Sequence, residues 1–455
     1  MRKLAWILLL VSTSAAAQDA FTSNVDKAVN EILAKTGAPS ASIAVVKDDK
    51  IIYTHAYGNA RIDPPMLATP EMRYSIGSIS KQFTAAAILM LAEEGKLSLD
   101  DKLVRWLPDL TRAGDVTLRE LLSMTSGYQD FWPQDYVMPR MLEPVTAQEI
   151  LNDWARKPLD FEPGTKWQYS NTNYVIAGVI VEKVAGMPLL DLLQRRVFGP
   201  LQMSSVFNTD LSGLGPNDPT RYLRYALGPL RPAPKEGRGW MFAAGELAMT
   251  PRDLALWDIS MIDQTILKPA SYRALETEVQ LANGVGTRYA LGLGVGITDG
   301  RRFVSHGGEV SGFTATNTVY PDDRAAVVVL TNLDATGASS QIATRIANLL
   351  FATTDPATEK TKEQMRKIFE GLQKGQIDRS QLTSNANAYF TDQALKDFAS
   401  SLSPLGTPQE FSQSSQSLRG GMTLRRYRIR FSQKNLTLTT FILPDGKIEQ
   451  YQIAA

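Results

Sequence analysis

The chain contains a single Ser-x-x-Lys sequence, Ser78-Ile79-Ser80-Lys81, whose spacing suits a serine activated by a lysine. On a helix, residues three positions apart lie on the same face about one turn apart, so we expect the Lys81 amine to reach the Ser78 hydroxyl. A helix N-terminus favours negative charge developing there, and burial would lower the pKa of Lys81 enough for it to act as a base. Ser78 is therefore the predicted nucleophile, with Lys81 as its partner.

A second group of candidate residues is Tyr169-Ser170-Asn171. A phenol beside the Ser/Lys pair can pass a proton to the leaving group, and an Asn amide can bind a substrate carbonyl. Tyr57-Gly58-Asn59 has the same pattern, but it follows a predicted hairpin strand upstream of Ser78. We therefore select Tyr169 and Asn171.

A third group, His306-Gly307-Gly308, follows a predicted strand. Glycines allow a substrate to lie against a strand edge, and a backbone N–H just after them can complete an oxyanion hole with that of Ser78. These three residues are predicted to bind substrate.

Other chemistries are poorly supported by the residues present. There are two histidines and no cysteine, which excludes a three-histidine zinc site, thiolate metal sites and disulfides. Neither G-x-S-x-G nor H-E-x-x-H occurs. The glycines at 292, 294 and 296 are not followed by a helix start, so a glycine-containing strand is favoured over a dinucleotide loop. We predict no metal and no cofactor.

In this order, the three groups resemble those of the class C β-lactamase and penicillin-binding protein family, which includes D-Ala-D-Ala carboxypeptidases, D-aminopeptidases and esterases. Residues 121–127, LLSMTSG, also resemble the family's L-L-x-H-T-S-G, with Met124 where histidine is usual. The resemblance covers about Ala28 to Phe351. It implies an acyl-enzyme on Ser78, with Lys81 as the base or the partner of the base. It further implies Tyr169 as proton relay, Asn171 as the group that orients the acyl side chain, a strand edge at His306, Gly307 and Gly308, and the Glu309 N–H as second oxyanion donor. Whether Lys81 or Tyr169 takes the serine proton stays open.

The third motif bears on the substrate. β-Lactamases of this family usually have K-T-G at the position of His306-Gly307-Gly308, and the lysine of that motif binds the substrate carboxylate. His306 replaces that lysine and is mostly neutral at pH 7 unless the site holds it protonated. The sequence thus favours a peptidase or esterase acting on an ester or amide, such as a D-amino-acid peptide. The alternatives are a β-lactamase that hydrolyses penicillins and cephalosporins, and a penicillin-binding sensor or scaffold without turnover.

The apolar patterns predict an α+β fold whose sheet is assembled from distant segments. The resemblance implies the β-lactamase/transpeptidase type, with an antiparallel sheet flanked by helices and a helical subdomain. Helices are predicted at Phe21–Thr36, from Ser78 to Glu94 and at Gln341–Phe351, with mostly helical segments between residues 103 and 274. Strands are predicted at 42–47, 51–57, 303–306, 313–320 and 325–331.

Residues 1–17 have the pattern of a secretory signal peptide: Arg2 and Lys3, an apolar run from Leu4 to Val11, and small residues before Gln18. We expect cleavage there and a secreted protein, in the bacterial periplasm. The apolar run is too short to span a membrane, so no membrane span is expected in the mature form.

The predicted domains are a serine hydrolase domain at 18–352 and a C-terminal α+β module at 353–455, which resembles the small domains of the NTF2-like type. The segment 353–356 and the Lys/Thr-rich stretch behind it have the composition of a linker. Arginines alternate with apolar residues at 426–431, a row that could meet anionic cell-wall material but more often is a solvated strand face. A net charge of +1 gives no indication of nucleic-acid binding. The expected partner is a small-molecule or peptide substrate.

Overall fold

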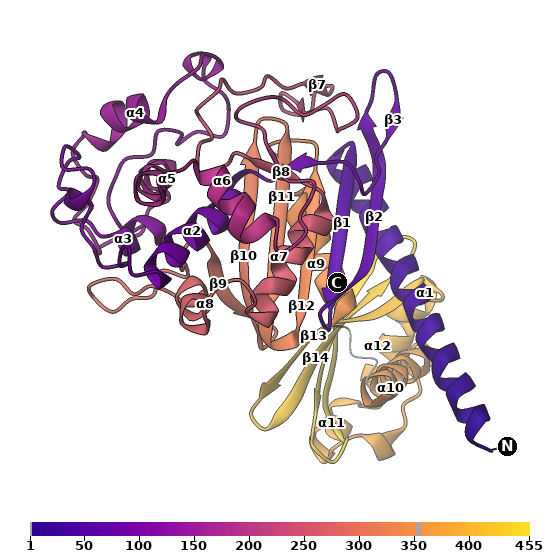
Figure 1. Cartoon of the computed structure of the whole chain (residues 1–455). Coiled ribbons are helices and arrows are strands. Elements are labelled where there is room, and N and C mark those ends of the chain that lie inside the picture. Colours follow the sequence, from indigo (N-terminus) through magenta and orange to yellow (C-terminus); the bar gives the residue numbers. More distant parts are fainter. Residues whose placement is uncertain (1, 352–355) are drawn as a thin grey trace. The chain divides into compact units, whose positions relative to one another are not determined.

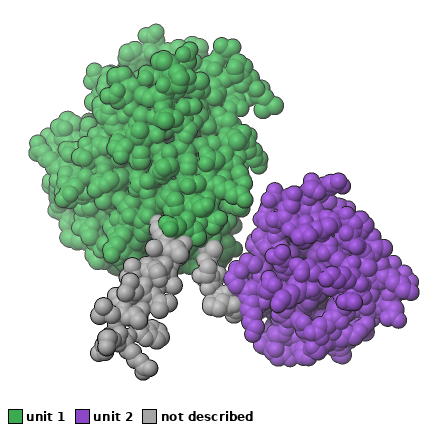
Figure 2. All heavy atoms as spheres, turned by 90° about the vertical axis from the view of Figure 1, so that its right-hand side faces the viewer, with its two compact units in different colours: residues 1–351 green, residues 352–455 purple. Residues whose placement is uncertain are grey.

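The computed structural model describes residues 2–351 and 356–455, with side chains from Asp19 to Phe351 and from Thr358 onward. The chain divides into two compact units, residues 1–351 and 352–455, coloured separately in Figure 2. The predicted leader, 1–17, and residues 353–356 of the predicted linker lie outside the described side chains, and leader cleavage stays a prediction. The Lys/Thr-rich stretch behind Pro356 was wrongly assigned to the linker, because it belongs to the helix Pro356–Leu372.

The first unit is built on a seven-stranded antiparallel sheet (Figure 1). Its order is β3 (Met66–Leu67), β2 (Lys50–Arg61), β1 (Ser40–Lys47), β12 (Ala325–Thr331), β11 (Phe313–Tyr320), β10 (Arg301–Val310) and β9 (Gly294–Thr298). Strands β1 and β12 are paired over Ala41–Lys47 and Ala325–Thr331, so the two ends of the unit's sequence meet at the centre of the sheet.

Strand β12 is buried along its whole length, which explains its unbroken apolar sequence. Its alternate side chains enter different cores because successive residues point to opposite faces. Val327 and Val329 join a core formed with α1 (Arg2–Thr36) and α9 (Ala338–Leu350). Val328 and Leu330 join the larger core that includes α2 (Lys81–Glu93) and α7 (Pro251–Asp263). Helices therefore cover both faces of the sheet.

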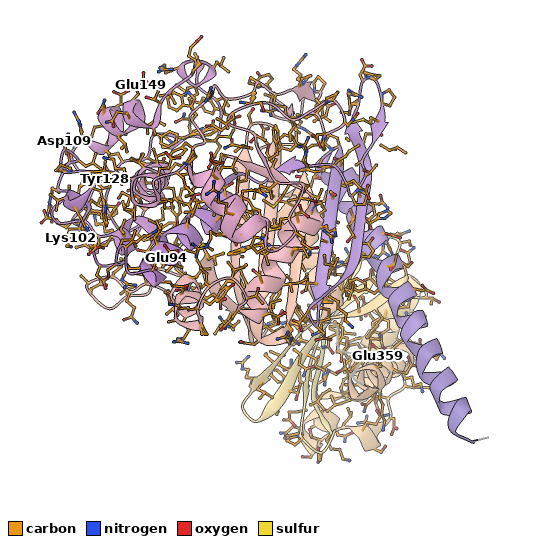
Figure 3. All side chains as sticks on the ribbon, in the orientation of Figure 1. Glu94, Lys102, Asp109, Tyr128, Glu149 and Glu359 are labelled. Carbon is orange, nitrogen blue, oxygen red and sulfur yellow. The ribbon has the colours of Figure 1, made fainter. Side chains whose placement is uncertain are left out.

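The segment between β2 and β9 forms the helical subdomain, in which Figure 3 labels Tyr128 and Glu149. Glu149 completes a capping box with Thr146 at the start of α4, so this short helix begins with its first backbone N–H groups satisfied. The remaining helices are α3 (Leu118–Leu122), α4 (Ala147–Ile150), α5 (Asn171–Ala185), α6 (Leu189–Leu193) and α8 (Pro269–Glu276). Short strands form two further sheets, β4 (Tyr74–Ser75), β8 (Leu247–Met249) and β5 (Phe207–Asn208) in one, and β6 (Tyr222–Leu223) with β7 (Arg231–Pro232) in the other.

The predicted fold class is confirmed, with three local differences. Ser78 lies in a 3₁₀ turn, Gly77–Ser80, and the α-helix begins only at Lys81. Gly307 and Gly308 lie inside β10 instead of following it, because they still pair with Thr316 and Ala315. The N-terminal helix extends upstream of Phe21.

The second unit has its own core of side chains from its helices and its sheet. It consists of α10 (Pro356–Leu372), α11 (Ser384–Tyr389), α12 (Asp392–Leu402) and the antiparallel strands β13 (Glu410–Arg419), β14 (Met422–Arg430), β15 (Asn435–Ile442) and β16 (Ile448–Ala454). Strand β13 was missed because its Ser/Gln-rich sequence has no apolar alternation. Across the described residues, no helix combines the length and apolarity that a membrane span requires.

Candidate active site

Ser78 is held in place by a close approach between its turn and strand β10. Gly77 has φ of +50°, and a Cβ there would lie 2.7 Å from the Glu309 nitrogen. A Cβ at Gly308 would lie 1.8 Å from the Ile76 carbonyl oxygen. Both positions therefore require glycine, because any side chain would push the nucleophile's turn away from the strand. Gly307 is different, since a Cβ there would meet nothing closer than 3.9 Å.

Lys81 is fully buried, and its amine makes three polar contacts. Nζ lies 2.9 Å from Ser78 Oγ, 2.8 Å from Asn171 Oδ1 and 2.8 Å from the Ala244 carbonyl oxygen. Burial lowers the pKa of Lys81 to about 7, although the Asp130 carboxylate opposes the shift. A neutral amine can donate its two N–H groups to the two carbonyl oxygens, which leaves the lone pair for the serine hydroxyl proton.

Asn171 is the first residue of α5, and its side-chain amide lies between Lys81 and Asp130. Its oxygen accepts from Lys81, while Nδ2 donates to Asp130 Oδ1 at 3.2 Å and Oδ2 at 3.3 Å. Asp130 Oδ1 also accepts the backbone N–H of Asn171 at 2.9 Å. The helix N-terminus and the carboxylate together determine which way the amide faces.

Tyr169 lies beside the Ser/Lys pair. The Lys81 nitrogen is 4.9 Å from the centre of its ring. Its hydroxyl is buried, and no described group meets it with hydrogen-bonding geometry. Burial raises the pKa of Tyr169, and the nearby Ser78 hydroxyl only partly offsets this. The phenol is therefore neutral in the resting site.

His306 is neutral in this site. Its Nε2 lies 2.9 Å from the Tyr289 hydroxyl and its Nδ1 2.5 Å from the Gly307 carbonyl oxygen. Burial, together with the charge of the nearby Lys81, lowers the pKa of His306 to about 4. At this position β10 thus presents no positive charge at pH 7.

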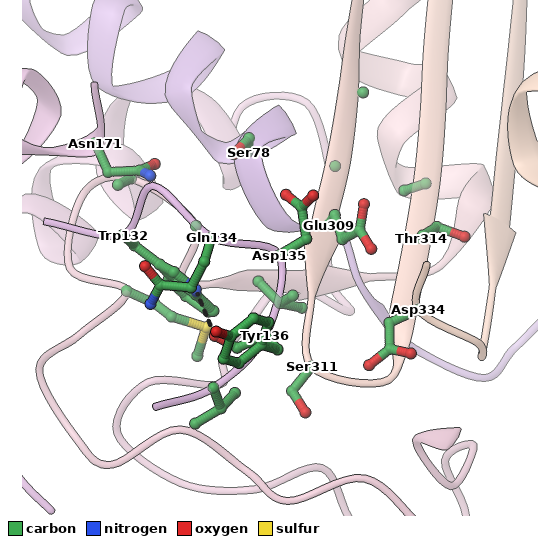
Figure 4. Close-up of a pocket in the computed structure, with 18 of the residues that line it drawn as sticks. Ser78, Trp132, Gln134, Asp135, Tyr136, Asn171, Glu309, Ser311, Thr314 and Asp334 are labelled. Atoms are coloured by element: carbon green, nitrogen blue, oxygen red, sulfur yellow. Dashed lines mark hydrogen bonds between the residues drawn. The ribbon is translucent and has the colours of Figure 1, made fainter. Parts of the chain in front are cut away.

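These groups line a cavity of about 970 Å³. Its lining contains four carboxyl groups, those of Asp130, Asp135, Glu309 and Asp334, and among the described residues no lysine or arginine. Figure 4 shows Asp135 and Glu309 with their carboxylates near each other, on the side of the cavity toward Ser78. Partial burial raises the pKa of Glu309, and the negative charges of Asp135 and Asp334 add to this. Aromatic side chains, including Trp132, Tyr136 and Trp240, form part of the wall.

The structure brings the predicted site residues together. Lining the cavity are Ser78, Tyr169, Asn171, His306, Gly307, Gly308 and Glu309, with Lys81 bonded to two of them. Tyr57 of the competing motif lies elsewhere, with its hydroxyl 2.6 Å from Asp26. Across the described side chains, no group of three or more His, Asp or Glu residues is placed to hold a metal ion.

Sequence reasoning missed Asp130. It lies among the aromatic residues Tyr128, Phe131 and Trp132, and Asp135 lies in the same aromatic segment, so no local pattern distinguished Asp130 as a site residue. Met124, where the family usually has histidine, is buried, and its sulfur accepts the Ser170 N–H at 3.4 Å. It therefore still supports the loop that carries Tyr169.

Comparisons with known proteins agree with this geometry. The family model described as Beta-lactamase matches residues 25–351. The chain therefore belongs to the β-lactamase family of serine hydrolases.

Among its relatives, a D-aminopeptidase from Brucella anthropi is 30% identical over 71% of this chain and 61% of its own length. The chain thus spans less than two thirds of that protein. A D-stereospecific amidohydrolase from Streptomyces sp. is 25% identical, with a TM-score of 0.64 over 73% of this chain and 99% of its own. The octameric penicillin-binding protein homologue from Pyrococcus abyssi shares the fold at 21% identity, with a TM-score of 0.63 over 95% of this chain and 99% of its own.

Proposed function

We propose that this protein hydrolyses an ester or amide through an acyl-enzyme on Ser78. The observation that carries the proposal is the 2.9 Å contact between Ser78 Oγ and a buried Lys81 amine whose pKa is lowered to about 7. Such an amine is partly unprotonated at neutral pH and can take the serine proton as the hydroxyl attacks. Tyr169 is a poorer base, because burial raises the pKa of its phenol.

In the proposed reaction, Ser78 Oγ bonds to the substrate carbonyl carbon, and its proton passes to Lys81. The backbone N–H groups of Ser78 and Glu309 stabilise the oxyanion. The bond to the leaving group then breaks, and Tyr169 passes the proton from Lys81 to that group. Water subsequently hydrolyses the acyl-enzyme, with the same groups moving the proton in reverse.

We propose a substrate whose acyl part carries a free ammonium group, of the D-amino-acid amide or peptide type. The four carboxyl groups of the cavity would attract a cation, whereas a penicillin or cephalosporin brings a carboxylate. The neutral His306 offers that carboxylate no cation. Similarity to a D-aminopeptidase and a D-stereospecific amidohydrolase supports the same class. β-Lactam hydrolysis is the second candidate, supported by the shared fold and family.

A matched set of substrates tests this choice. We expect a D-alanine anilide to be hydrolysed faster than its N-acetyl derivative and than propionanilide, because the first change removes the ammonium charge while adding an acetyl group and the second removes the amine without adding atoms. A chromogenic cephalosporin should react more slowly than any of them. Equal rates for the three anilides, or fastest turnover of the cephalosporin, would contradict the proposed substrate class.

Ser78→Ala tests the mechanism itself. We expect the variant to lose all turnover and all covalent labelling by a fluorescent penicillin. Labelling of the unchanged protein at Ser78 without turnover of any ester, amide or cephalosporin would instead indicate a penicillin-binding sensor or scaffold.

We further propose that the protein is exported to the periplasm after cleavage before Gln18, with a hydrolase domain at 18–352 and an accessory domain at 353–455. The leader pattern supports export. N-terminal sequencing of the protein from the periplasmic fraction of expressing bacteria tests it, and an intact Met1 on that protein would contradict cleavage.

A further inference from the structure

Asp130 has no role in the proposed reaction, yet its carboxylate is bonded directly to the site. Its Oδ1 accepts the backbone N–H groups of Asn171 at 2.9 Å and of Trp132 at 3.1 Å, and both oxygens accept from Asn171 Nδ2. Burial raises the pKa of Asp130, but all of these partners are donors, and together with the charge of Lys81 they oppose that rise and favour the ionised carboxylate. We infer that Asp130 is a positioning residue: its carboxylate fixes the Asn171 amide against Lys81 and supplies the negative charge that the Lys81 ammonium faces during the reaction. This inference rests on the proposed function.

The first part of the inference follows from the asymmetry of an amide. Asn171 turns its oxygen to Lys81, 2.8 Å away, and its NH₂ group to Asp130. With the amide reversed, the NH₂ group would meet the Lys81 donor and the oxygen would meet a carboxylate, so both contacts would become repulsive. Asp130 therefore selects the amide orientation in which the Asn171 oxygen accepts a hydrogen bond from the Lys81 amine.

The second part concerns charge. When Lys81 takes the serine proton, it becomes a cation in a buried site, which is costly unless a negative charge is near. The other titratable groups around it are Tyr169 and Tyr174, whose rings lie 4.9 and 5.5 Å from Nζ, and His306. The two phenols are held neutral because burial raises their pKa, and His306 is neutral because burial lowers its own. Asp130 is the carboxylate whose charge acts on Lys81.

The test is the pH dependence of kcat/KM in Asp130→Asn, measured with the full chain and the best substrate of the panel. An Asn oxygen at the Oδ1 position can keep the bonds to both backbone N–H groups and the 3.2 Å bond to Asn171 Nδ2. Its NH₂ group replaces Oδ2 and loses the longer 3.3 Å bond to Asn171, so this variant removes the charge and one long hydrogen bond. Without the charge the pKa of Lys81 falls. We therefore expect the acid limb of the profile, the range in which kcat/KM rises with pH, to move about one pH unit lower. The rate on the plateau should also fall, because Lys81 becomes a weaker base.

Two further variants separate charge from geometry. Asp130→Ala also removes the hydrogen bonds, so we expect a plateau rate at least about tenfold below that of Asp130→Asn, as the loss of a charged hydrogen-bond partner implies. Glu309→Gln removes another carboxylate of the same cavity whose charge does not act on Lys81; its rate can change, but its acid limb should stay in place. Thermal denaturation establishes that each variant is folded.

An acid limb in Asp130→Asn at the same pH as in the unchanged protein would overturn the charge role, and so would an equal shift in Glu309→Gln. Equal plateau rates for Asp130→Asn and Asp130→Ala would overturn the positioning role. If Asp130→Ala does not fold, Asp130→Asn decides the charge role, and Asp130→Ser takes the place of Asp130→Ala in the comparison of plateau rates. A wild-type protein that hydrolyses nothing refutes the proposed function, whereas active protein with an unmoved limb refutes only this inference.

Discussion

The side-chain oxygen of Asn171 lies 2.8 Å from the amine nitrogen of Lys81, although 90 residues separate them along the chain. Each residue begins a helix, α5 and α2 respectively, and the two helices pack in the same core. The N-terminal ends of both helices thus meet at the nucleophile. This adds a third partner, beside the Ser78 hydroxyl and the Ala244 carbonyl, for an amine whose burial makes every lost contact costly.

The pH dependence of hydrolysis should report the state of Lys81. Because burial lowers its pKa to about 7, the amine is protonated below that pH and cannot take the serine proton. We expect kcat/KM to rise with pH through about 7 and then level off. A rate that is flat on either side of pH 7 would show that Lys81 is not the base.

Replacing Lys81 with Met removes the base but keeps a side chain of similar length. Positioned bases contribute at least about 100-fold to such reactions, so we expect a loss of at least that size. Stopped-flow acylation by a chromogenic ester measures it, and circular dichroism checks that the variant is folded.

Gly308→Ala and Gly307→Ala form a matched pair for the contact between the nucleophile's turn and β10. A Cβ at Gly308 would lie 1.8 Å from the Ile76 oxygen, so this variant must displace the turn and lose most labelling of Ser78. At Gly307 there is room for the methyl group, so we expect little change in thermal stability. Equal Ser78 labelling and equal stability in the two variants would contradict this account of the contact.

His306→Lys should change which charge the site prefers. The new ammonium would give a β-lactam carboxylate a partner that the neutral histidine does not provide. We expect faster acylation by a penicillin and slower hydrolysis of the D-alanine anilide. His306→Gln is the neutral control, and an equal gain in penicillin acylation there would show that charge is not the cause.

Deleting residues 352–455 should leave the rate of hydrolysis unchanged. Every residue that lines the cavity belongs to the first unit, which has its own cores. Active-site titration with a fluorescent penicillin corrects for any unfolded protein. A large loss of kcat/KM per labelled site would instead give the second unit a part in catalysis.

The residue types and their spacing were sufficient to predict much of this protein. The Ser78–Lys81 spacing is local, so one helical turn brings the two side chains together wherever the helix lies. The alternation in β11 and the unbroken apolar run of β12 predicted those strands because burial on one or both faces determines such patterns. The polar strand β13 has no such pattern and was not predicted.

Only the tertiary structure decided which groups surround Ser78 and Lys81. Asp130 lies on a loop and contacts Asn171 at the start of α5. Asp135, Glu309 and Asp334 line one cavity but come from separate segments of the chain. No local pattern encodes these distances, because they depend on how the helical subdomain packs against the sheet. The lowered pKa of Lys81 has the same origin: it is caused by burial, and burial is a property of the folded chain.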